Sequence, residues 1–485
     1  MQRTSKMNGL RGQFILSRGT QEPHPEWECA SQFGWFLQTH PSLRLHNVFD
    51  TTGVSAGWLL GYAIDTGSQR MLSGDWLLHC EASQENCSSI ESQLYSLAGR
   101  YVLILLGKDI QRIYADPSAS LSTLYSADQQ VVGSTASALG AVDPSPLAAQ
   151  ISRTREASGT WYPCGLTEWR NLHVLLPNHY LDLNSWVVRR HWPECNAPIP
   201  SKLRDTDATI REICQRLAAN IAAVVADHHA TMELTAGRDT RMLLACSKQL
   251  IDRIQFETSP THSATDVDIS AKLATLFKLN HHVSQPVNLR HALLQGAAGE
   301  VGRAFYWRRS DYQQLALSGK EIAERMHFPD TTFVPQLQDW LDELPQLSIF
   351  AKLDLLYVEQ RLAMAHAPAN YERDCRFAFT LFPLSDRRIF ELMMSLPPSY
   401  RLRQALCPDI CKLRWPELNL FPINSPYFEG VGFGKYRKLL KQSTFRGLNR
   451  EQRSFLRKQT FRTSSLVHLI VDDLKKVWRR LFRST

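Results

Sequence analysis

Short apolar runs bounded by turn residues recur through the first 192 residues of the chain. Runs of this length and composition are typical of β-strands. Residues 107–109 lie between two such runs as a hairpin signal, and residues 172–183 read as one further hairpin. The pattern predicts a layered antiparallel domain with few helices, with strands at residues 13–17, 58–64, 99–106, 110–115, 123–125 and 130–134.

A different pattern follows in the second half of the chain. Residues 207–227 have the apolar spacing of a long amphipathic helix, and residues 230–234 and 253–258 read as buried strands. A helix is expected after each strand, the second at residues 266–279, and the chain reads as mostly helical from residue 311 onward. Alternating strands and helices predict a doubly wound parallel sheet.

Candidate chemistry lies at the expected ends of these strands, where doubly wound sheets bind ligands. Thr235, Thr258 and residues 295–299 fall at such ends. Residues 235–240, Thr-Ala-Gly-Arg-Asp-Thr, join a strand to a helix. Small residues allow a ligand to approach the backbone closely, and a helix start offers free N–H donors to an anion such as phosphate. Asp239 is placed to bind the accompanying Mg²⁺. The alternative is a capped turn without a ligand.

Composition sets the broad class of the chain. Its 485 residues are 44% hydrophobic and 21% charged, which is ordinary for a globular protein. The sequence has no apolar stretch long enough to span a membrane and no apolar secretory signal, so we expect a cytoplasmic protein. The ten cysteines are scattered, which argues against a structural zinc site or a disulfide framework.

Three Pro residues, Pro193, Pro198 and Pro200, mark residues 193–202 as a linker between domains at 1–192 and 203–434. Residues 435–485 form a basic tail. It holds fifteen Lys and Arg and three acids, a net charge of +12 within a total of +8. Its apolar residues recur near helical spacing. Such a tail suits an anionic membrane surface, nucleic acid or another polyanion, and a solvated helical end is the alternative.

Several segments resemble, in order along the chain, the asparagine synthetase family, which includes β-lactam-forming synthetases. Residues 235–240 resemble its Ser-Gly-Gly-x-Asp-Ser loop. Residues 295–301 resemble Ser-Gly-Glu-Gly-x-Asp-Glu, where Gly296 and Glu300 match and the first Glu and the Asp have no counterparts. Residues 360–366 are similar to Asp-Arg-x-x-Met-Ala-His. Asp266 and the pair His281-His282 resemble positions downstream of the family's second strand, although the pair itself reads as a packing element.

The resemblance implies a fold for each half. Residues 1–192 would form a β-rich sandwich of the N-terminal-nucleophile (Ntn) hydrolase type. Residues 203–434 would form a doubly wound ATP-pyrophosphatase domain, of the adenine nucleotide α-hydrolase type, with a helical extension. The family begins Met-Cys-Gly-Ile with a nucleophilic cysteine, whereas this chain has Asn8 in the segment Met-Asn-Gly-Leu. Asparagine cannot act as a thiolate nucleophile, so glutamine hydrolysis is not expected.

The resemblance also implies a reaction that uses ATP and Mg²⁺. A carboxylate would be adenylated, and ammonia or an amine would then displace AMP to form an amide. Asp239 would bind Mg²⁺, Leu234 and Thr258 would border the adenine, and Arg238 would contact phosphate or point to solvent. The implied nucleotide-binding residues are Leu234, Thr235, Ala236, Gly237, Arg238, Asp239, Thr240, Thr258 and Gly296.

Other candidates for the reaction are less tied to the motifs. Glu300 would orient substrate or metal, or cap a helix start. Tyr357 and Glu359 form either a proton-transfer pair or part of a structural ion pair with Arg361. Lys435 is a candidate for the family's transition-state lysine. A homologue that has lost catalysis and acts as a scaffold is the alternative, and a homodimer is left open.

Overall fold

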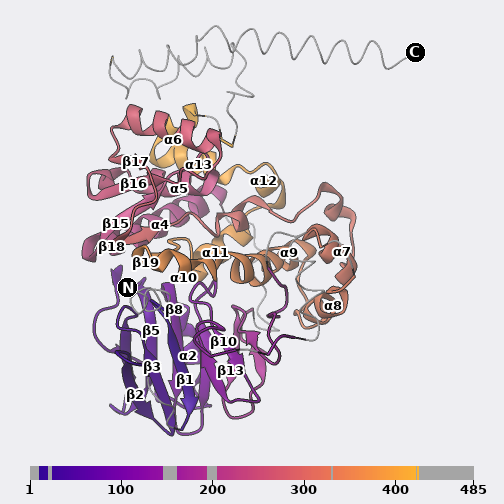
Figure 1. Cartoon of the computed structure of the whole chain (residues 1–485). Coiled ribbons are helices and arrows are strands. Elements are labelled where there is room, and N and C mark those ends of the chain that lie inside the picture. The colour runs from indigo at the N-terminus through magenta and orange to yellow at the C-terminus, as the bar shows by residue number, and fades with distance from the viewer. Residues whose placement is uncertain are drawn as a thin grey trace.

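Two stacked regions make up the computed structural model, with antiparallel pairing dominant in one and a parallel sheet in the other (Figure 1). The structure describes residues 10–19, 24–141, 143–145, 161–193, 205–328, 331–421, 423–424 and 450. Helices and strands are mixed in the chain, as the sequence pattern predicts. Asn8, Lys435, most of the predicted linker and nearly all of the basic tail lie outside the described residues.

The first sheet is antiparallel and runs in the order β12-β10-β11-β1-β3-β2. Its strands are β1 (Phe14–Arg18), β2 (Glu28–Gln32), β3 (Trp35–Thr39), β10 (Leu124–Ser126), β11 (Val131–Gly133) and β12 (His173–Val174). The second sheet runs β14-β13-β9-β8-β5-β4-β7, with β6 on β5. Its strands are β4 (Leu45–Phe49), β5 (Ser55–Asp65), β6 (Arg70–Met71), β7 (Trp76–Leu77), β8 (Leu97–Leu106), β9 (Gln111–Ala115), β13 (His179–Asp182) and β14 (Val188–Arg190).

These two sheets pack face to face, because alternate residues of their strands are apolar and point inward. Phe14 and Leu16 of β1 share one core with Leu60 of β5 and Ile104 of β8. The other face of the second sheet packs against the single described helix of this region, α2 (Cys87–Leu94). The six predicted strand positions are therefore confirmed as a layered β-rich unit.

The predicted hairpin at residues 172–183 is wrong. β12 pairs with β10 in the first sheet, whereas β13 pairs with β9 and β14 in the second. The chain crosses from one sheet to the other between them, through Pro177, which has no N–H to donate to a ladder, and Asn178 with its φ of 68°. Apolar residues on both sides of the crossing are buried, so the apolar pattern alone could not distinguish it from a hairpin.

The third sheet is parallel throughout and runs β17-β16-β15-β18-β19. Its strands are β15 (His229–Glu233), β16 (Ile254–Thr258), β17 (His281–Val283), β18 (Asn288–Leu294) and β19 (Phe377–Leu381). Helix α4 (Thr206–Asp227) precedes β15, α5 (Arg238–Cys246) follows it, and α6 (Ala264–Phe277) follows β16. The strand–helix alternation predicted for this half is confirmed, with β19 as an additional strand inside the largely helical segment.

Helices fill the rest of the described chain. The α-helices after β18 are α7 (Gly319–Arg325), α8 (Val334–Asp342), α9 (Ile349–Leu355), α10 (Ala369–Asp374), α11 (Arg387–Ser395), α12 (Pro398–Leu402) and α13 (Leu406–Arg414). A π-helix, η4 (Leu356–His366), continues α9 directly. Short 3-10 helices are η1 (Lys248–Arg253), η2 (Gly299–Arg303), η3 (Arg309–Gln313) and η5 (Pro416–Leu420). Among the described residues, none of these helices has both the length and the apolar character needed to cross a membrane.

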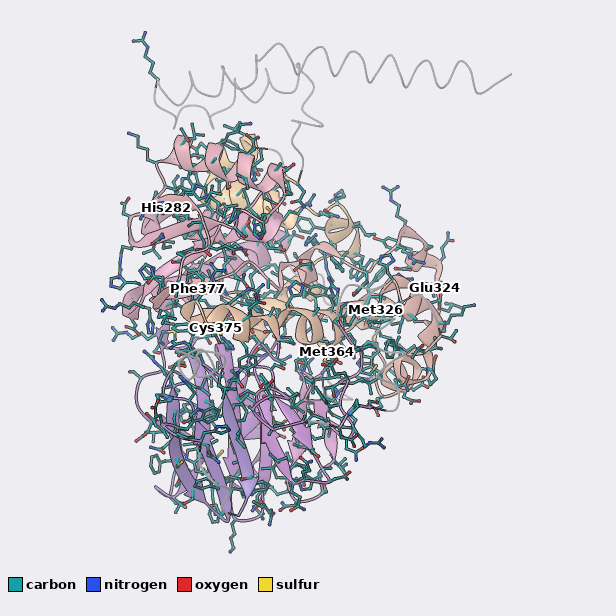
Figure 2. All side chains as sticks on the ribbon, in the orientation of Figure 1. His282, Glu324, Met326, Met364, Cys375 and Phe377 are labelled. Carbon is teal, nitrogen blue, oxygen red and sulfur yellow. The ribbon has the colours of Figure 1, made fainter. Side chains whose placement is uncertain are left out.

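Buried polar contacts join the parallel sheet to the antiparallel sheets. Arg100 of β8 pairs with Asp374 of α10 at 2.7 Å, and both side chains are almost fully buried. Tyr62 of β5 stacks on Phe379 of β19 with ring centroids 3.7 Å apart. Figure 2 shows Cys375 and Phe377 at this level, where the chain enters β19 above the antiparallel strands. A buried charge needs a partner to be tolerated, so the Arg100–Asp374 pair fixes how the two regions meet.

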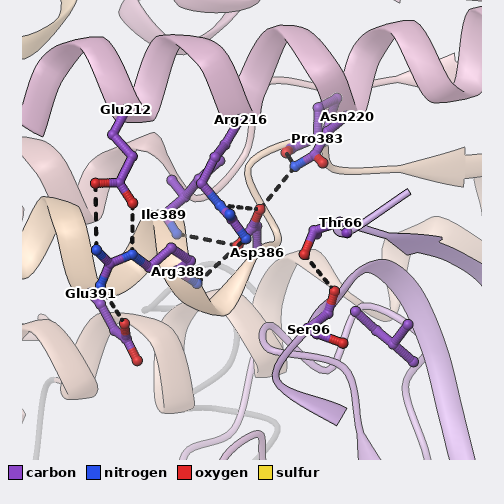
Figure 3. Close-up of polar contacts among 12 residues, drawn as sticks. Thr66, Ser96, Glu212, Arg216, Asn220, Pro383, Asp386, Arg388, Ile389 and Glu391 are labelled. Carbon is purple, nitrogen blue, oxygen red and sulfur yellow. Dashed lines mark hydrogen bonds and ion pairs between the residues drawn. The ribbon is translucent and has the colours of Figure 1, made fainter. Parts of the chain in front are cut away.

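Asp386 holds the start of α11, as Figure 3 shows. Its carboxylate accepts hydrogen bonds from the backbone N–H of Arg388 at 2.8 Å and from Arg216 of α4 at 3.2 Å. Arg388 itself pairs with Glu212, also on α4, at 2.8 Å. Capping of this kind satisfies helix donors and favours a negative charge at the N-terminus. These contacts fix α11 against α4, the helix that leads into β15.

Candidate functional site

The predicted phosphate loop lies at the carboxyl end of the middle strand of the parallel sheet. Residues 235–240 follow β15 and lead into α5, and residues 295–299 follow the neighbouring strand β18. The chain order of the strands reverses direction between β15 and β18, since β16 and β17 lie on one side and β18 and β19 on the other. Doubly wound sheets bind ligands at such a reversal, so both predicted segments stand at the expected place.

Two glycines let these segments touch. A Cβ atom at Gly296 would lie 2.6 Å from the backbone nitrogen of Thr240, and one at Gly299 would lie 2.2 Å from Oδ1 of Asp239. Both distances are shorter than any real carbon contact, so a side chain at either position would push the two segments apart. Gly296 is a residue that the motif comparison singled out, whereas Gly299 had no separate role there.

Asp239 and Glu300 come together at the contact between the segments, and Arg303 lies between them. Nη2 of Arg303 is 2.7 Å from Oε1 of Glu300 and 3.4 Å from Oδ2 of Asp239. The Asp239 residue is only 8% exposed. Its second oxygen, Oδ1, and the second oxygen of Glu300, Oε2, are buried and accept no hydrogen bond from a described donor. An unpaired buried oxygen calls for a proton or a cation.

The electrostatics of this pair follow from burial and from like charge. Burial, and then the negative charge of Glu300, raise the pKa of Asp239 well above its ordinary value. Burial works in the same direction on Glu300, but the Arg303 guanidinium and the neighbouring Tyr357 phenol outweigh it and lower the pKa of that carboxyl. Burial and like charge thus act against a second negative charge in the free site, and Arg303 is the cation that contacts both carboxyls.

The loop also makes bonds within itself. The hydroxyls of Thr235 and Thr240 are 2.9 Å apart, and Oγ1 of Thr235 accepts from the N–H of Gly237 at 3.0 Å. The N–H of Ala236 donates to Asp266 at 2.9 Å, so the aspartate matched to the family does reach the loop. Helix α5 begins at Arg238, and the N–H groups of its first turn have no partner inside the helix. Those first-turn groups are the donors available to an anion.

Leu234 and Thr258 lie side by side at the ends of β15 and β16, as expected. The Thr258 hydroxyl donates to the carbonyl of Leu234 at 2.7 Å and lies 2.8 Å from Nε2 of His281. Both side chains are fully buried, so any contact with a ligand would come from their backbone. His281 is a packing residue of this corner, in agreement with the sequence-based interpretation.

Tyr357 and Glu359 do not pair with each other, and the alternative, a structural ion pair, holds for Glu359 with Arg190 in place of Arg361. Tyr357 lies close to Glu300. Burial, and then the negative charge of Glu300, raise the pKa of the Tyr357 phenol well above its ordinary value. Glu359 instead binds Arg190 of β14 at 2.5 Å and accepts from Trp340 at 2.8 Å. Residues two apart on a helix point in different directions, and here the two faces of η4 meet different parts of the molecule. Glu359 is therefore a structural residue, and Tyr357 belongs to the site.

Two residues of the site were not predicted. Arg303 lies three residues after Glu300 on η2, a spacing at which charged side chains pair on one helix turn, and that signal could have found it. Asn424 contacts the loop through its backbone N–H, which donates to the carbonyl of Ala236 at 3.0 Å. It is too far along the chain for any local pattern to indicate this contact. Lys435 lies outside the described residues.

The donor set suits Mg²⁺ bound together with phosphate. Mg²⁺ in nucleotide sites is commonly held by one or two carboxylates, while phosphate and water complete its shell. Asp239 and Glu300 supply two carboxylates, each with an oxygen that no described donor occupies. Within the described residues, no group of three or more His, Cys, Asp or Glu side chains is arranged to hold a metal ion by itself. The site therefore fits a metal that arrives with a nucleotide.

Comparison with known proteins adds no relative. No protein-family model matches the chain, and no curated protein matches its sequence. The likeness to asparagine synthetases therefore rests on the segments quoted above and on what their positions in the structure support.

Proposed function

We propose that the chain is an ATP-dependent, AMP-forming carbon–nitrogen ligase that resembles asparagine synthetase and lacks glutaminase activity of its own. Residues 203–434 would act as the ATP-pyrophosphatase domain, and residues 1–192 as an Ntn-type sandwich in which Asn8 replaces the nucleophile. Its substrates would be ATP, a carboxylate, and ammonia or a larger amine.

One observation carries this proposal. Asp239 and Glu300, from two segments that the motif comparison selected independently, meet at the carboxyl ends of β15 and β18 with a buried unpaired oxygen on each. Two acids of like charge are costly to bury together unless a cation or a proton serves them. Binding of Mg²⁺ with phosphate would supply the cation that the two buried acids need.

The roles of the residues follow from their positions. The first-turn N–H groups of α5 and the Thr235 and Thr240 hydroxyls would bind the pyrophosphate part of ATP. Asp239 and Glu300 would hold Mg²⁺, which spreads the charge that develops on the phosphates when it is bound. The substrate carboxylate attacks the α-phosphorus, pyrophosphate leaves, and the amine then displaces AMP. Tyr357, which neighbours Glu300, would take part in proton transfer from that amine.

Isotope exchange tests the proposal. In the presence of its carboxylate substrate, the protein should exchange labelled pyrophosphate into ATP. The Asp239→Asn variant should reduce the exchange rate by about a hundredfold or more, because it removes a ligand on which transition-state charge depends. Asp252→Asn is the control, since Asp252 is an exposed acid on η1, the 3-10 helix that follows α5. Exchange that persists in Asp239→Asn would contradict the assignment of the site.

A second candidate function is a homologue that has lost catalysis and serves as a scaffold. The observation in its favour is that the site is already partly satisfied without a ligand: the N–H of Ala236 donates to Asp266, the N–H of Gly237 donates to Thr235, and Arg303 contacts both carboxyls. The two candidates differ in ATP binding. A scaffold should give no heat on titration with a non-hydrolysable ATP analogue and Mg²⁺, whereas the ligase should bind it.

A further inference from the structure

Arg303 contacts both carboxyls of the site. Its Nη2 bridges one oxygen of Glu300 at 2.7 Å and one oxygen of Asp239 at 3.4 Å. Those oxygens and the two unpaired ones belong to the same pair of carboxyls. None of the family segments recognised in the sequence accounts for this arginine. It is a positive charge already present at the place where the proposed reaction needs one.

The contacts of Arg303 leave it able to move. Only Nη2 is engaged with the carboxylates, and Nε is buried without a partner among the described residues. The side chain is 22% exposed and its guanidinium lies 5.7 Å from the ring of Phe305, which is 45% exposed. A guanidinium with unused donors and an open side can turn toward an anion and bind it through two N–H groups.

A second arginine indicates where the anion would be. Arg238 is the first residue of α5, is half-buried, and directly precedes Asp239, the residue that Arg303 contacts. Two arginines beside a helix N-terminus are stabilised when an anion lies between them. The side of the carboxylate pair that Arg303 would leave is thus adjacent to a site suited to phosphate.

We propose that Arg303 is an exchangeable counter-ion. In the free protein it neutralises Asp239 and Glu300; when the metal–nucleotide complex arrives, the metal takes its place and Arg303 turns onto the phosphates. This inference rests on the proposed function for its ligand, but its first half concerns the carboxylates alone. Metal and arginine compete for the same oxygens, whereas arginine and nucleotide cooperate.

The test measures the two halves separately. Mn²⁺ binding to the full-length protein without nucleotide, followed by electron paramagnetic resonance, should be tighter by about tenfold or more in Arg303→Met, because the competing charge is gone. Binding of a non-hydrolysable ATP analogue with Mg²⁺ should be weaker by about tenfold in the same variant, because a charged hydrogen bond to phosphate is lost. Arg309→Met, at an exposed arginine on η3, should leave both affinities unchanged.

A purely structural arginine would move both affinities in the same direction. The proposal is therefore overturned if folded Arg303→Met binds Mn²⁺ no more tightly than the original protein, or binds the analogue equally well. If Arg303→Met does not fold, Arg303→Lys replaces it, since lysine keeps the charge but not the fork. It should also weaken analogue binding, and unchanged binding would overturn the proposal. Absence of pyrophosphate exchange with an intact Mn²⁺ effect would instead reject the proposed function and leave the counter-ion.

Discussion

At the scale of single residues, the geometry of the site depends on a glycine as well as on its charged side chains. A Cβ atom at Gly299 would lie 2.2 Å from Oδ1 of Asp239. Gly299→Ala should displace that carboxylate and lower the free energy of unfolding by about 1–3 kcal/mol, the usual cost of overpacking. Chemical denaturation measures this. Gly67→Ala, at an exposed glycine whose Cβ would meet only the Asp65 side chain, is the control, and an equal loss there would contradict the argument.

Glu257 makes the stability of the folded protein depend on pH. Burial, which outweighs the Arg376 ion pair, raises the pKa of Glu257 from 4.5 to about 7. The folded state therefore holds a proton that the unfolded state releases, so this contribution is complete below pH 4.5 and is lost as the pH rises through about 7. Glu257→Gln should gain stability relative to the original protein at pH 8 but not at pH 4.5. A pH-independent difference in urea midpoint would contradict this.

At the scale of elements, sequence patterns located strands and loops well and contacts between them poorly. The loop at 235–240 and the segment at 295–299 were predicted because apolar runs and small residues are local features. The partner of Tyr357 was not, because Glu300 lies on a different element. The crossing between β12 and β13 was also missed, because a strand pattern does not state which sheet the strand joins.

One ion pair joins the π-helix η4 to the antiparallel region. It is formed by Glu359 of η4, whose side chain is fully buried, and Arg190 of β14. Arg190→Met leaves that carboxylate without its charge partner and should destabilise the protein by about 3–5 kcal/mol. Arg170→Met, which breaks an exposed pair with Asp143, should cost less than about 1 kcal/mol. Comparable losses in the two variants, by thermal or chemical denaturation, would show that η4 is held by other contacts.

At the scale of the whole molecule, charge is divided unevenly along the chain. Residues 435–485 carry a net charge of +12, and we propose that they bind an anionic surface. Removal of this segment should abolish salt-sensitive sedimentation of the protein with vesicles that contain phosphatidylserine, since counter-charge attraction is screened by salt. Neutral phosphatidylcholine vesicles are the control. Vesicle binding that survives the truncation would assign the attraction to another part of the chain.

The central claim is that the end of β15 and β18 binds a nucleotide with its metal. Calorimetric titration of the full-length protein with a non-hydrolysable ATP analogue in Mg²⁺ tests it most directly. We predict saturable binding that Asp239→Asn weakens by about a hundredfold, in line with the loss of a metal ligand, and that Asp252→Asn leaves unchanged. Absence of binding to the original protein, or equal binding by Asp239→Asn, would contradict the account.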